Sequence, residues 1–414
     1  MSHAAVAIPG LDRMGGAERQ AMVLAKGLCR RGWRVSMVAL SGTGGAAATE
    51  LRDSGVAFIS LEMRKGLADP RGWLRFHRWL WREQPDVVHA HLPHAAWLAR
   101  WSRLIAPVPV VIDTLHSSYT GKKGRRIGYG CSRWLPDHVT AVSGATAASH
   151  LAAGMAREED LSVLSNGIDV ATWRPDVQVR SATRRALGLG DEFLWIAVGR
   201  LEAVKDYQTL LRAFSRLQGY CASKPLKTGY SFPETAAPCA PATARLLMLG
   251  AGPLQAELVE LTAQLGLEQR VHFFGFEPNV RRWMQAADGF VLSSRYEGLP
   301  MVLLEAGACG LPTVATDVAG TREVIVDGEN GCLAPAGNPH ALASAMAWLM
   351  HVPIEERRAM GECARRRVVE QFGLETVLDR WERLYEDLLR RKSGEWPIRP
   401  AARESLSRRS AASA

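Results

Sequence analysis

Short apolar runs alternate with helical patterns through most of this chain, and this alternation restricts the fold more than any other feature. In the first half the runs that read as strands are 5–8, 34–40, 56–61, 86–91, 108–114, 138–142 and 161–164. A second cycle comprises 194–199, 245–250, 271–274, 289–292, 312–315 and 331–333. Strands separated by helices pair in parallel through βαβ units. The pattern therefore predicts an α/β fold with two Rossmann-like parallel-sheet domains facing a central cleft.

Turn signals and composition shifts divide the 414 residues into segments. A hinge is expected at 166–169, which places a first domain at 1–170 and a second at 171–373. Residues 219–243, rich in Pro, Ala, Ser and Thr, read as an insertion in the second domain. An amphipathic helix at 374–392 is expected to pack back on the first domain, and 393–414 reads as a disordered basic tail.

Composition is that of a soluble globular protein, with 47% hydrophobic and 22% charged residues. The seven cysteines form no Cys-x-x-Cys pair, and no apolar run approaches the ~20 residues of a membrane span. The N-terminus lacks the pattern of a signal peptide. We therefore expect a cytoplasmic protein. With a net charge of +9, the surface could bind anionic small ligands or anionic lipid, or could simply be solvated. No nucleic-acid-binding signature accompanies the charge.

Two carboxylates eight positions apart mark the most informative local stretch. Gly298 and Pro300 place Glu297 in a loop, and the residues after Pro300 read as the start of a helix that carries Glu305. The free N–H groups at a helix N-terminus bind phosphates, whereas carboxylates accept hydrogen bonds from hydroxyls. The stretch therefore suits a ligand that has both groups.

Two strand-to-helix loops have the composition of phosphate sites. Gly15 and Gly16 follow the first strand and would allow close backbone approach to a ligand, although a simple tight turn explains them equally well. Arg200 and Lys205 occupy the first loop of the second half, where a diphosphate would need cations. A basic pair in a loop is more often only solvated, but the matching glycine loop in the other domain favours function.

The remaining candidates are single polar residues at strand ends. His116 ends the fifth strand, where a structural, hydrogen-bonded histidine is the simpler alternative to a catalytic one. His89, His91 and His94 could suggest a metal site. We interpret their spacing instead as that of a strand and the turn that follows it. Glu277 follows a strand where a nucleotide base would bind, although packing of its neighbour Phe276 is the simpler explanation. The chain contains no Asp-x-Asp, so no metal is expected.

Two basic segments could contact a membrane. Residues 71–82 form a helix dense in Trp and Arg, and 122–126 form a cluster of Lys and Arg. Such segments bind anionic lipid, which would make the protein peripheral on the inner face of the cell membrane. An ordinary amphipathic helix beside a solvated loop remains an equal alternative.

Taken together, these motifs resemble retaining, nucleotide-sugar-dependent glycosyltransferases of GT-B type in family four. The resemblance rests on the Glu297–Glu305 motif and its continuation, Val-Gly-Arg200-Leu-x(3)-Lys205-Asp, Gly-Ala-Gly-Pro253, Asn-Gly-Ile-Asp169 and Gly-Gly-Ala-Glu18. The Gly-Gly-Ala-Glu18 loop and His116-Ser-Ser-Tyr resemble members that build capsule, O-antigen and lipopolysaccharide glycans. The insertion at 219–243 departs from the usual short connection.

The resemblance implies transfer of a hexose or N-acetylhexosamine, UDP-linked, to a lipid-linked or saccharide acceptor, without a cofactor. The second domain would bind the nucleotide sugar and the first the acceptor. Arg200 and Lys205 would hold the diphosphate, together with Gly15, Gly16 and the backbone of Gly298, Leu299, Pro300 and Met301.

Catalytic roles also follow from the resemblance. Glu305 would bind the ribose, and Glu297 and His116 would contact the transferred sugar. A nucleotide-sugar epimerase of the same shape and a non-catalytic nucleotide-sugar sensor are the alternatives. A dinucleotide dehydrogenase is disfavoured because the G-x-G-x-x-G fingerprint is missing.

Overall fold

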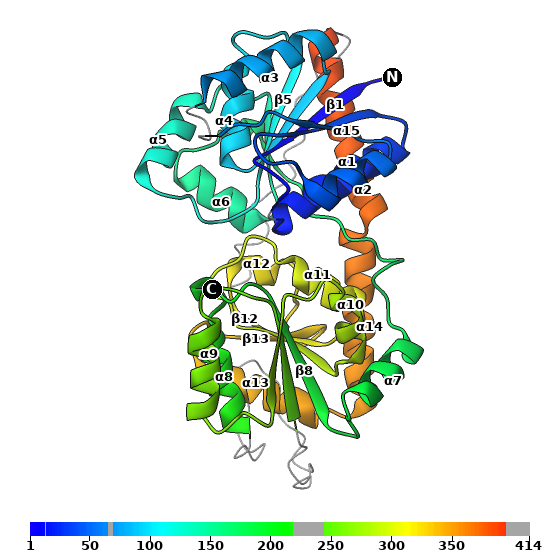
Figure 1. The fold of residues 1–414 in the computed structure, drawn as a ribbon. Coiled ribbons are helices and arrows are strands. Elements are labelled where there is room, and N and C mark those ends of the chain that lie inside the picture. The colour runs from blue at the N-terminus through cyan, green and yellow to red at the C-terminus, as the bar shows by residue number, and fades with distance from the viewer. Residues whose placement is uncertain (13, 65–68, 218–243, 395–414) are drawn as a thin grey trace.

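The computed structural model describes residues 1–12, 14–64, 69–217 and 244–394. Within these ranges the named strands form two parallel sheets, one at the centre of each domain (Figure 1). The insertion predicted at 219–243 lies outside the described residues, as does the predicted tail apart from its first two residues.

The first sheet has the strand order β3-β2-β1-β4-β5-β6-β7. Its strands are β1 (His3–Ile8), β2 (Arg34–Ala39), β3 (Ala57–Ser60), β4 (Val87–His91), β5 (Val110–Leu115), β6 (His138–Ala141) and β7 (Leu161–Val163). The second sheet has the order β10-β9-β8-β11-β12-β13. Its strands are β8 (Phe193–Val198), β9 (Ala244–Leu249), β10 (Val271–Gly275), β11 (Gly289–Leu292), β12 (Thr313–Thr316) and β13 (Gly331–Ala334).

Helices cover both faces of each sheet (Figure 1). Those of the first half are α1 (Gly16–Arg30), α2 (Gly45–Asp53), α3 (Pro70–Glu83), α4 (Pro93–Ser102), α5 (Lys123–Ser132) and α6 (Gly144–Ala152). Those that follow are α7 (Val177–Ala186), α8 (Tyr207–Arg216), α9 (Gln255–Gln264), α10 (Val280–Ala286), α11 (Met301–Ala308), α12 (Ala319–Arg322), α13 (Pro339–His351), α14 (Ile354–Phe372) and α15 (Leu374–Ser393).

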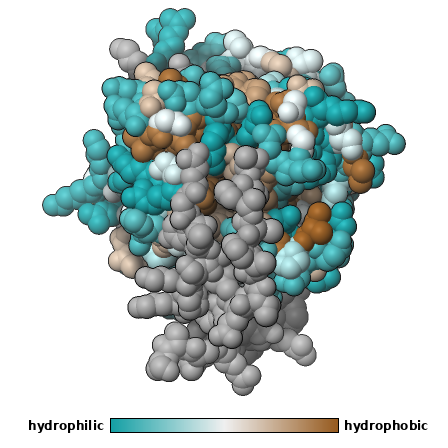
Figure 2. Space-filling model, turned by 90° about the horizontal axis from the view of Figure 1, so that it is seen from below, coloured by the Kyte–Doolittle hydropathy of each residue, from teal (hydrophilic) through white to brown (hydrophobic). Residues whose placement is uncertain are grey.

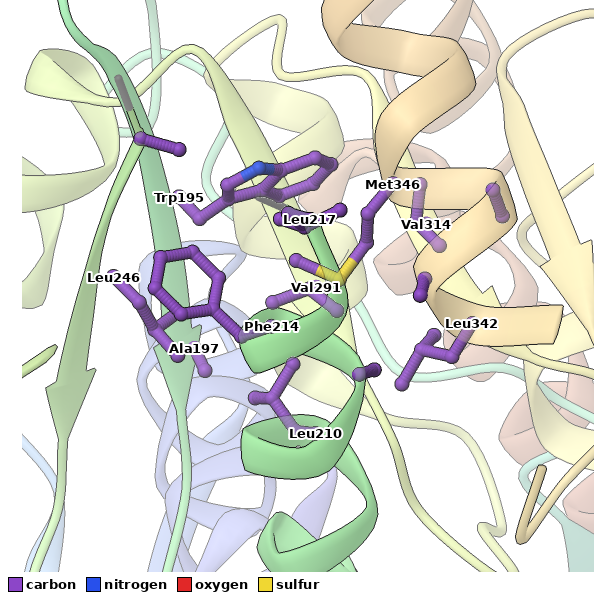
Figure 3. Packing of buried hydrophobic residues seen from close by; sticks show 14 of the residues in the cluster. Trp195, Ala197, Leu210, Phe214, Leu217, Leu246, Val291, Val314, Leu342 and Met346 are labelled. Atoms are coloured by element: carbon purple, nitrogen blue, oxygen red, sulfur yellow. The ribbon is translucent and has the colours of Figure 1, made fainter. Parts of the chain in front are cut away.

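Burial on both faces explains why the strands could be recognised in the sequence. Every residue of β1, β5 and β8 is buried, and a parallel sheet with helices on both sides selects near-continuous apolar runs. In the second domain Trp195 of β8 packs with Phe214 of α8 and Met346 of α13 (Figure 3). The predicted two-domain parallel-sheet fold is confirmed.

The chain crosses between the domains twice, at one place. Ile168 forms a parallel bridge with Gly373: its N–H donates to the Phe372 carbonyl, and its own carbonyl accepts from the Leu374 N–H, each at 2.9 Å. The predicted hinge and the junction of α14 with α15 are therefore hydrogen-bonded to each other. A change in the angle between the domains must bend both segments together.

Helix α15 returns from the second domain and packs on the first (Figure 1). Its buried residues Leu378, Trp381 and Tyr385 join the core of the first sheet. Gly27 of α1 allows this approach, because a Cβ there would lie 2.6 Å from the methyl carbons of Leu378. The prediction that the C-terminal helix packs back on the first domain is confirmed.

Figure 2 shows the surface at the far end of the second domain. Seen from the end of the second domain, the coloured residues are mainly hydrophilic, with separate hydrophobic patches (Figure 2). None of the helices in the described ranges combines the length and the apolar character needed to cross a membrane.

Candidate active site

Loops at the carboxyl ends of both sheets meet at the boundary between the domains, the position where parallel sheets bind ligands. The loop after β11 contains the central contact. Oε1 of Glu297 accepts from Lys205 Nζ and from Ser294 Oγ, each at 2.6 Å. Lys205 ends a short 3-10 turn (Ala203–Lys205) in the loop after β8. The structure thus joins two residues that are 92 positions apart in the chain and that the sequence placed at one site.

The same loop touches the first domain through its backbone. Ser118 Oγ, beyond the end of β5, donates to the Glu297 carbonyl at 3.2 Å. A Cβ on Gly298 would lie 2.4 Å from the His116 carbonyl oxygen, and one on Gly320 would lie 2.5 Å from the Gly298 oxygen. Glycine is therefore required at 298 by the packing of the two domains.

Two helix N-termini face each other across this boundary. Helix α11 begins at Met301, Pro300 is its N-cap, and no side chain caps it. Gly16 opens α1, and a Cβ on it would lie 3.8 Å from Met301 Cγ. Free N–H groups and the positive ends of two helix dipoles are thus directed to one place, which favours an anion. Pro300 has no N–H, so its contribution is to start the helix; the neighbouring Leu299 is buried.

Gly15 caps α1 without a side chain, and its N–H donates to Glu18 at 3.0 Å. The N–H of Gly15 is therefore occupied by the protein itself, and Gly16 follows it as the first residue of the helix.

Glu305 lies in the second turn of α11 and is 8% exposed. Burial raises the pKa of its carboxyl group to about 7, opposed by the positive charge of Arg19. Among the described residues none hydrogen-bonds this carboxylate. Arg19 was not predicted as a site residue; its position four residues after Gly15, on the helix that opens at the same loop, was the available signal.

Arg200 and Glu277 are held by neighbours in the chain. Arg200 is exposed and pairs with Glu202 at 2.9 Å. Glu277 accepts from the Asn279 N–H at 2.9 Å and from Arg282 at 3.0 Å, and these bonds, the Asn279 one foremost, lower the pKa of its carboxyl group. That Arg200 and Glu277 bind the donor stays a prediction.

The Gly250-x-Gly252 turn has a structural role. A Cβ at Gly250 would lie 1.9 Å from the Gly199 carbonyl oxygen, and one at Gly252 would lie 2.5 Å from that of Leu201. The turn therefore supports the loop that carries Arg200.

His116 directly follows β5 and is partly buried. Its Nε2 lies 2.8 Å from Nδ1 of His91. His89 is bonded instead to Tyr385 of α15 and to Thr114 of β5, both at 2.6 Å. Burial lowers the pKa of His116 to about 4 and that of His89 to about 3, so both rings are neutral at pH 7.

The histidines at 89, 91 and 94 do not form a metal site. His94 is exposed at the start of α4, whereas the other two are buried in hydrogen bonds. Among the described residues no group of three His, Cys, Asp or Glu side chains is placed to hold a metal ion. A pocket of about 350 Å³, its opening included, lies beside His91 and His116 and reaches Gln20, Asn166 and Trp381.

Solved structures share this two-domain architecture. The chain superposes on Anabaena HepE in complex with UDP-glucose with a TM-score of 0.77 and 21% identity, covering 93% of this chain and 99% of that one. The chain therefore has the GT-B fold.

Sequence comparison then identifies the family. Residues 14–172 match the family described as "Glycosyltransferase Family 4", and residues 179–367 match "Glycosyl transferases group 1". The chain is a glycosyltransferase of this group 1 and family 4 type. Membership of this enzyme family sets aside the epimerase and sensor alternatives.

Curated relatives differ in what they act on. The chain is 29% identical over 326 residues to "N-acetyl-alpha-D-glucosaminyl L-malate synthase" of Bacillus anthracis, covering 75% of this chain and 76% of the relative. It is 22% identical over 342 residues to "UDP-Gal:alpha-D-GlcNAc-diphosphoundecaprenol alpha-1,3-galactosyltransferase" of Escherichia coli, covering 78% and 81%. Their names specify a small acid and a lipid diphosphate, so family membership alone does not define the acceptor.

Proposed function

We propose that this glycosyltransferase moves a hexose or N-acetylhexosamine from a UDP-linked donor to a lipid-linked or saccharide acceptor, with retention of anomeric configuration, in the synthesis of a cell-surface glycan. The single observation that carries the proposal is the Lys205–Glu297 pair, placed beside the uncapped start of α11 and against the first-domain loop that carries His116.

The pair is complementary to the two halves of a nucleotide sugar. A diphosphate entering beside α11 offers Lys205 a stronger anionic partner, and Arg200 lies exposed in the same loop to join it. Release of Lys205 leaves the Glu297 carboxylate free to accept hydrogen bonds from hydroxyls of the transferred sugar. Donor binding thus exchanges an internal ion pair for two contacts with the substrate.

Glu305 suits the ribose. A buried carboxylate without a partner costs free energy, and the two hydroxyls of a ribose would supply its missing hydrogen bonds. We therefore assign Glu305 to donor binding and not to acid–base catalysis.

Retention is proposed from the resemblance to retaining family members, and the way the carboxylates are held bears on how it is achieved. A double displacement requires a free carboxylate as nucleophile at the anomeric carbon. In the donor complex we propose, Glu297 keeps its hydrogen bond from Ser294 and accepts hydrogen bonds from the sugar hydroxyls, and Glu305 is buried, so neither is assigned as the nucleophile. We infer attack from the face that the diphosphate leaves: the C1–O bond breaks as the acceptor oxygen bonds to C1, and the leaving phosphate takes the acceptor proton. Contact between the two domains excludes water from this step.

The donor and acceptor classes are supported by similarity. UDP-glucose is bound by the superposing Anabaena protein, and the E. coli relative is named for UDP-galactose and a lipid diphosphate acceptor. The expectation that no metal or cofactor takes part is kept in the proposal.

Membrane attachment through 71–82 and 122–126 is also proposed. Trp81 and Leu74 of α3 and Ile127 of α5 are about half exposed, beside exposed Arg and Lys side chains. Helices α3 and α5 pack on the same face of the first sheet, since both contribute to one core cluster. Exposed aromatic and cationic side chains on one face suit an anionic bilayer.

The test combines binding and transfer. A panel of nucleotide sugars is screened for protection against thermal unfolding, and the best donor is incubated with membrane extract as acceptor. Label should pass to the lipid fraction, and the new linkage should keep the donor's anomeric configuration by NMR. Inversion would refute the retaining mechanism, and stabilisation only by non-uridine donors would refute the donor class. Transfer only to soluble small acids would refute the acceptor class.

A further inference from the structure

His91 is the last residue of β4, is 2% exposed, and has its Nδ1 at 2.8 Å from Nε2 of His116. We propose that His91 is a positioning residue: it donates from Nδ1 to Nε2 of His116, so that His116 offers an N–H at Nδ1 to the transferred sugar. The inference rests on the proposed contact between His116 and the sugar. His91 does not touch the sugar in this proposal and acts on it only through His116.

Counting protons limits the pair to two arrangements. Burial lowers the pKa of both rings below the usual range, so both are neutral at pH 7. A neutral imidazole has one N–H and one bare nitrogen. Either His91 donates to His116, which then has its N–H on Nδ1, or His116 donates to His91, which then has its N–H on Nε2.

The surroundings of His91 distinguish these arrangements. Its Nε2 is buried and has no hydrogen-bond partner among the described residues. In the second arrangement this atom would be a buried N–H without an acceptor, which folded proteins rarely contain. In the first arrangement it is a bare nitrogen, and the only N–H of His91 is used. The first arrangement is therefore favoured, and the bond that one nitrogen of a histidine makes sets the state of the other.

Packing keeps the His91 ring in place. The centroid of the His89 ring lies 4.1 Å from that of His91, and the Trp381 ring of α15 lies 4.6 Å from His89. His89 is itself bonded at both nitrogens, to Tyr385 and Thr114. The support of His116 thus extends through two histidines to the helix that returns from the second domain.

Four variants test the proposal. His91→Leu keeps the volume and removes the hydrogen bond, whereas His91→Asn places an amide near the position of Nδ1. His116→Ala removes the proposed sugar contact. His3→Leu is the matched control, because His3 is a buried strand histidine bonded to Ser36, at the opposite end of β1 from the site.

The expected kinetic result is a loss in kcat with little change in donor KM. One hydrogen bond of ordinary strength that matters in the transition state corresponds to roughly a tenfold loss in kcat for His91→Leu. His91→Asn should recover most of that loss, and His3→Leu should leave kcat unchanged. In a His116→Ala background, His91→Leu should have no further effect.

A spectroscopic readout is independent of activity. In protein labelled with ¹⁵N at histidine, the His116 resonances should show the proton on Nδ1, and His91→Leu should shift them towards a mixture of both forms. The spectrum of the unchanged protein tests the proton position even if a variant fails to fold. A proton on Nε2 of His116 would overturn the proposal.

The sugar contact of His116 and the positioning role of His91 can be disproved separately. If His116→Ala transfers sugar normally, the proposed function of His116 is wrong. If His116→Ala is impaired but His91→Leu is as active as His3→Leu, the proposed function stands and the positioning role of His91 is wrong.

Discussion

Lys205 Nζ lies 2.6 Å from Oε1 of Glu297, so the groups assigned to the diphosphate and to the transferred sugar are paired with each other in the free protein. Both side chains are less than one-fifth exposed. The pair keeps two charges fixed at the boundary of the domains before any ligand arrives.

Lys205→Met should weaken donor binding by roughly 10–100-fold, because a charge-assisted hydrogen bond contributes about 1.5–3 kcal/mol. Calorimetric titration with the UDP-sugar measures this. Lys26→Met is the matched control, since Lys26 forms a 2.7 Å ion pair with Glu50 on the surface of the first domain. Equal affinities of the two variants would contradict the assignment of Lys205 to the diphosphate.

Gly16→Ala and Gly298→Ala should fail in different ways. A Cβ at Gly16 meets its nearest atom at 3.8 Å, so the variant should fold with unchanged stability yet lose donor affinity if the diphosphate approaches this backbone. A Cβ at Gly298 would overlap the His116 carbonyl oxygen, so that variant should disturb the contact between the domains without any ligand. Thermal unfolding and donor titration of both variants separate the effects. Normal donor affinity in Gly16→Ala would remove Gly16 from the site.

Donor affinity should rise with pH around neutrality because of Glu305. Its pKa in the free protein is raised to about 7, and ribose hydroxyls bind best to the ionised carboxylate. Below pH 7 binding must therefore remove a proton, and affinity should fall by up to tenfold for each pH unit. A UDP-sugar is the right probe, because its diphosphate is esterified at both ends and has no further proton to lose in this range. Glu305→Gln should bind weakly at every pH, and an unchanged slope in that variant would refute the prediction.

Glu305 should also make the stability of the free protein fall as pH rises, whereas donor affinity rises. A carboxyl group whose pKa is raised on folding destabilises the native state as pH rises from about 4.5, its unfolded value, through 7. Glu305→Gln should therefore be more stable than the parent at pH 8 and similar to it at pH 4.5. Urea unfolding at the two pH values checks this, and a stability difference independent of pH would contradict it.

Buried histidines should make the fold sensitive to acid. Burial lowers the pKa of His89 to about 3 and of His116 to about 4, against 6.5 when unfolded. Their contribution to stability is complete above pH 6.5 and is lost as pH falls towards the folded pKa values. His89→Gln, which cannot be protonated, should lose less stability than the parent between pH 7 and pH 5 in urea unfolding. An identical loss would show that other groups dominate.

Vesicle binding tests the membrane proposal. Cosedimentation should be found with vesicles that contain phosphatidylglycerol, should weaken with salt, and should be absent with phosphatidylcholine alone. Trp81→Ser with Ile127→Ser should reduce binding without affecting donor titration, since both side chains are exposed and distant in the chain from the donor loops. Binding that is equal for both lipids and insensitive to the variants would refute it.

The sequence determined most of the architecture. Burial on both faces leaves a nearly continuous apolar run for each strand, so β8 and β11 were recognisable from local composition. The segment at 298–308 was likewise readable, because glycine and proline restrict the backbone whatever lies around them. Catalytic candidates at strand ends followed from the rule that parallel sheets bind ligands at their carboxyl ends.

Only the tertiary structure decided how these residues are paired. Nothing local to Lys205 indicates that Glu297 is its partner, because ion pairs depend on distance in space and these residues lie in the loops after two different strands. His91 was expected in the strand 86–91, but nothing local to it indicated that β4 and β5 would place it against His116. Arg19 became relevant only where α1 meets α11. The sequence specified the two sheets and the residues at their edges, since both follow from local patterns of apolar, glycine and proline residues. The charges and protons of the site follow from contacts between distant segments, which burial and the meeting of the two domains create.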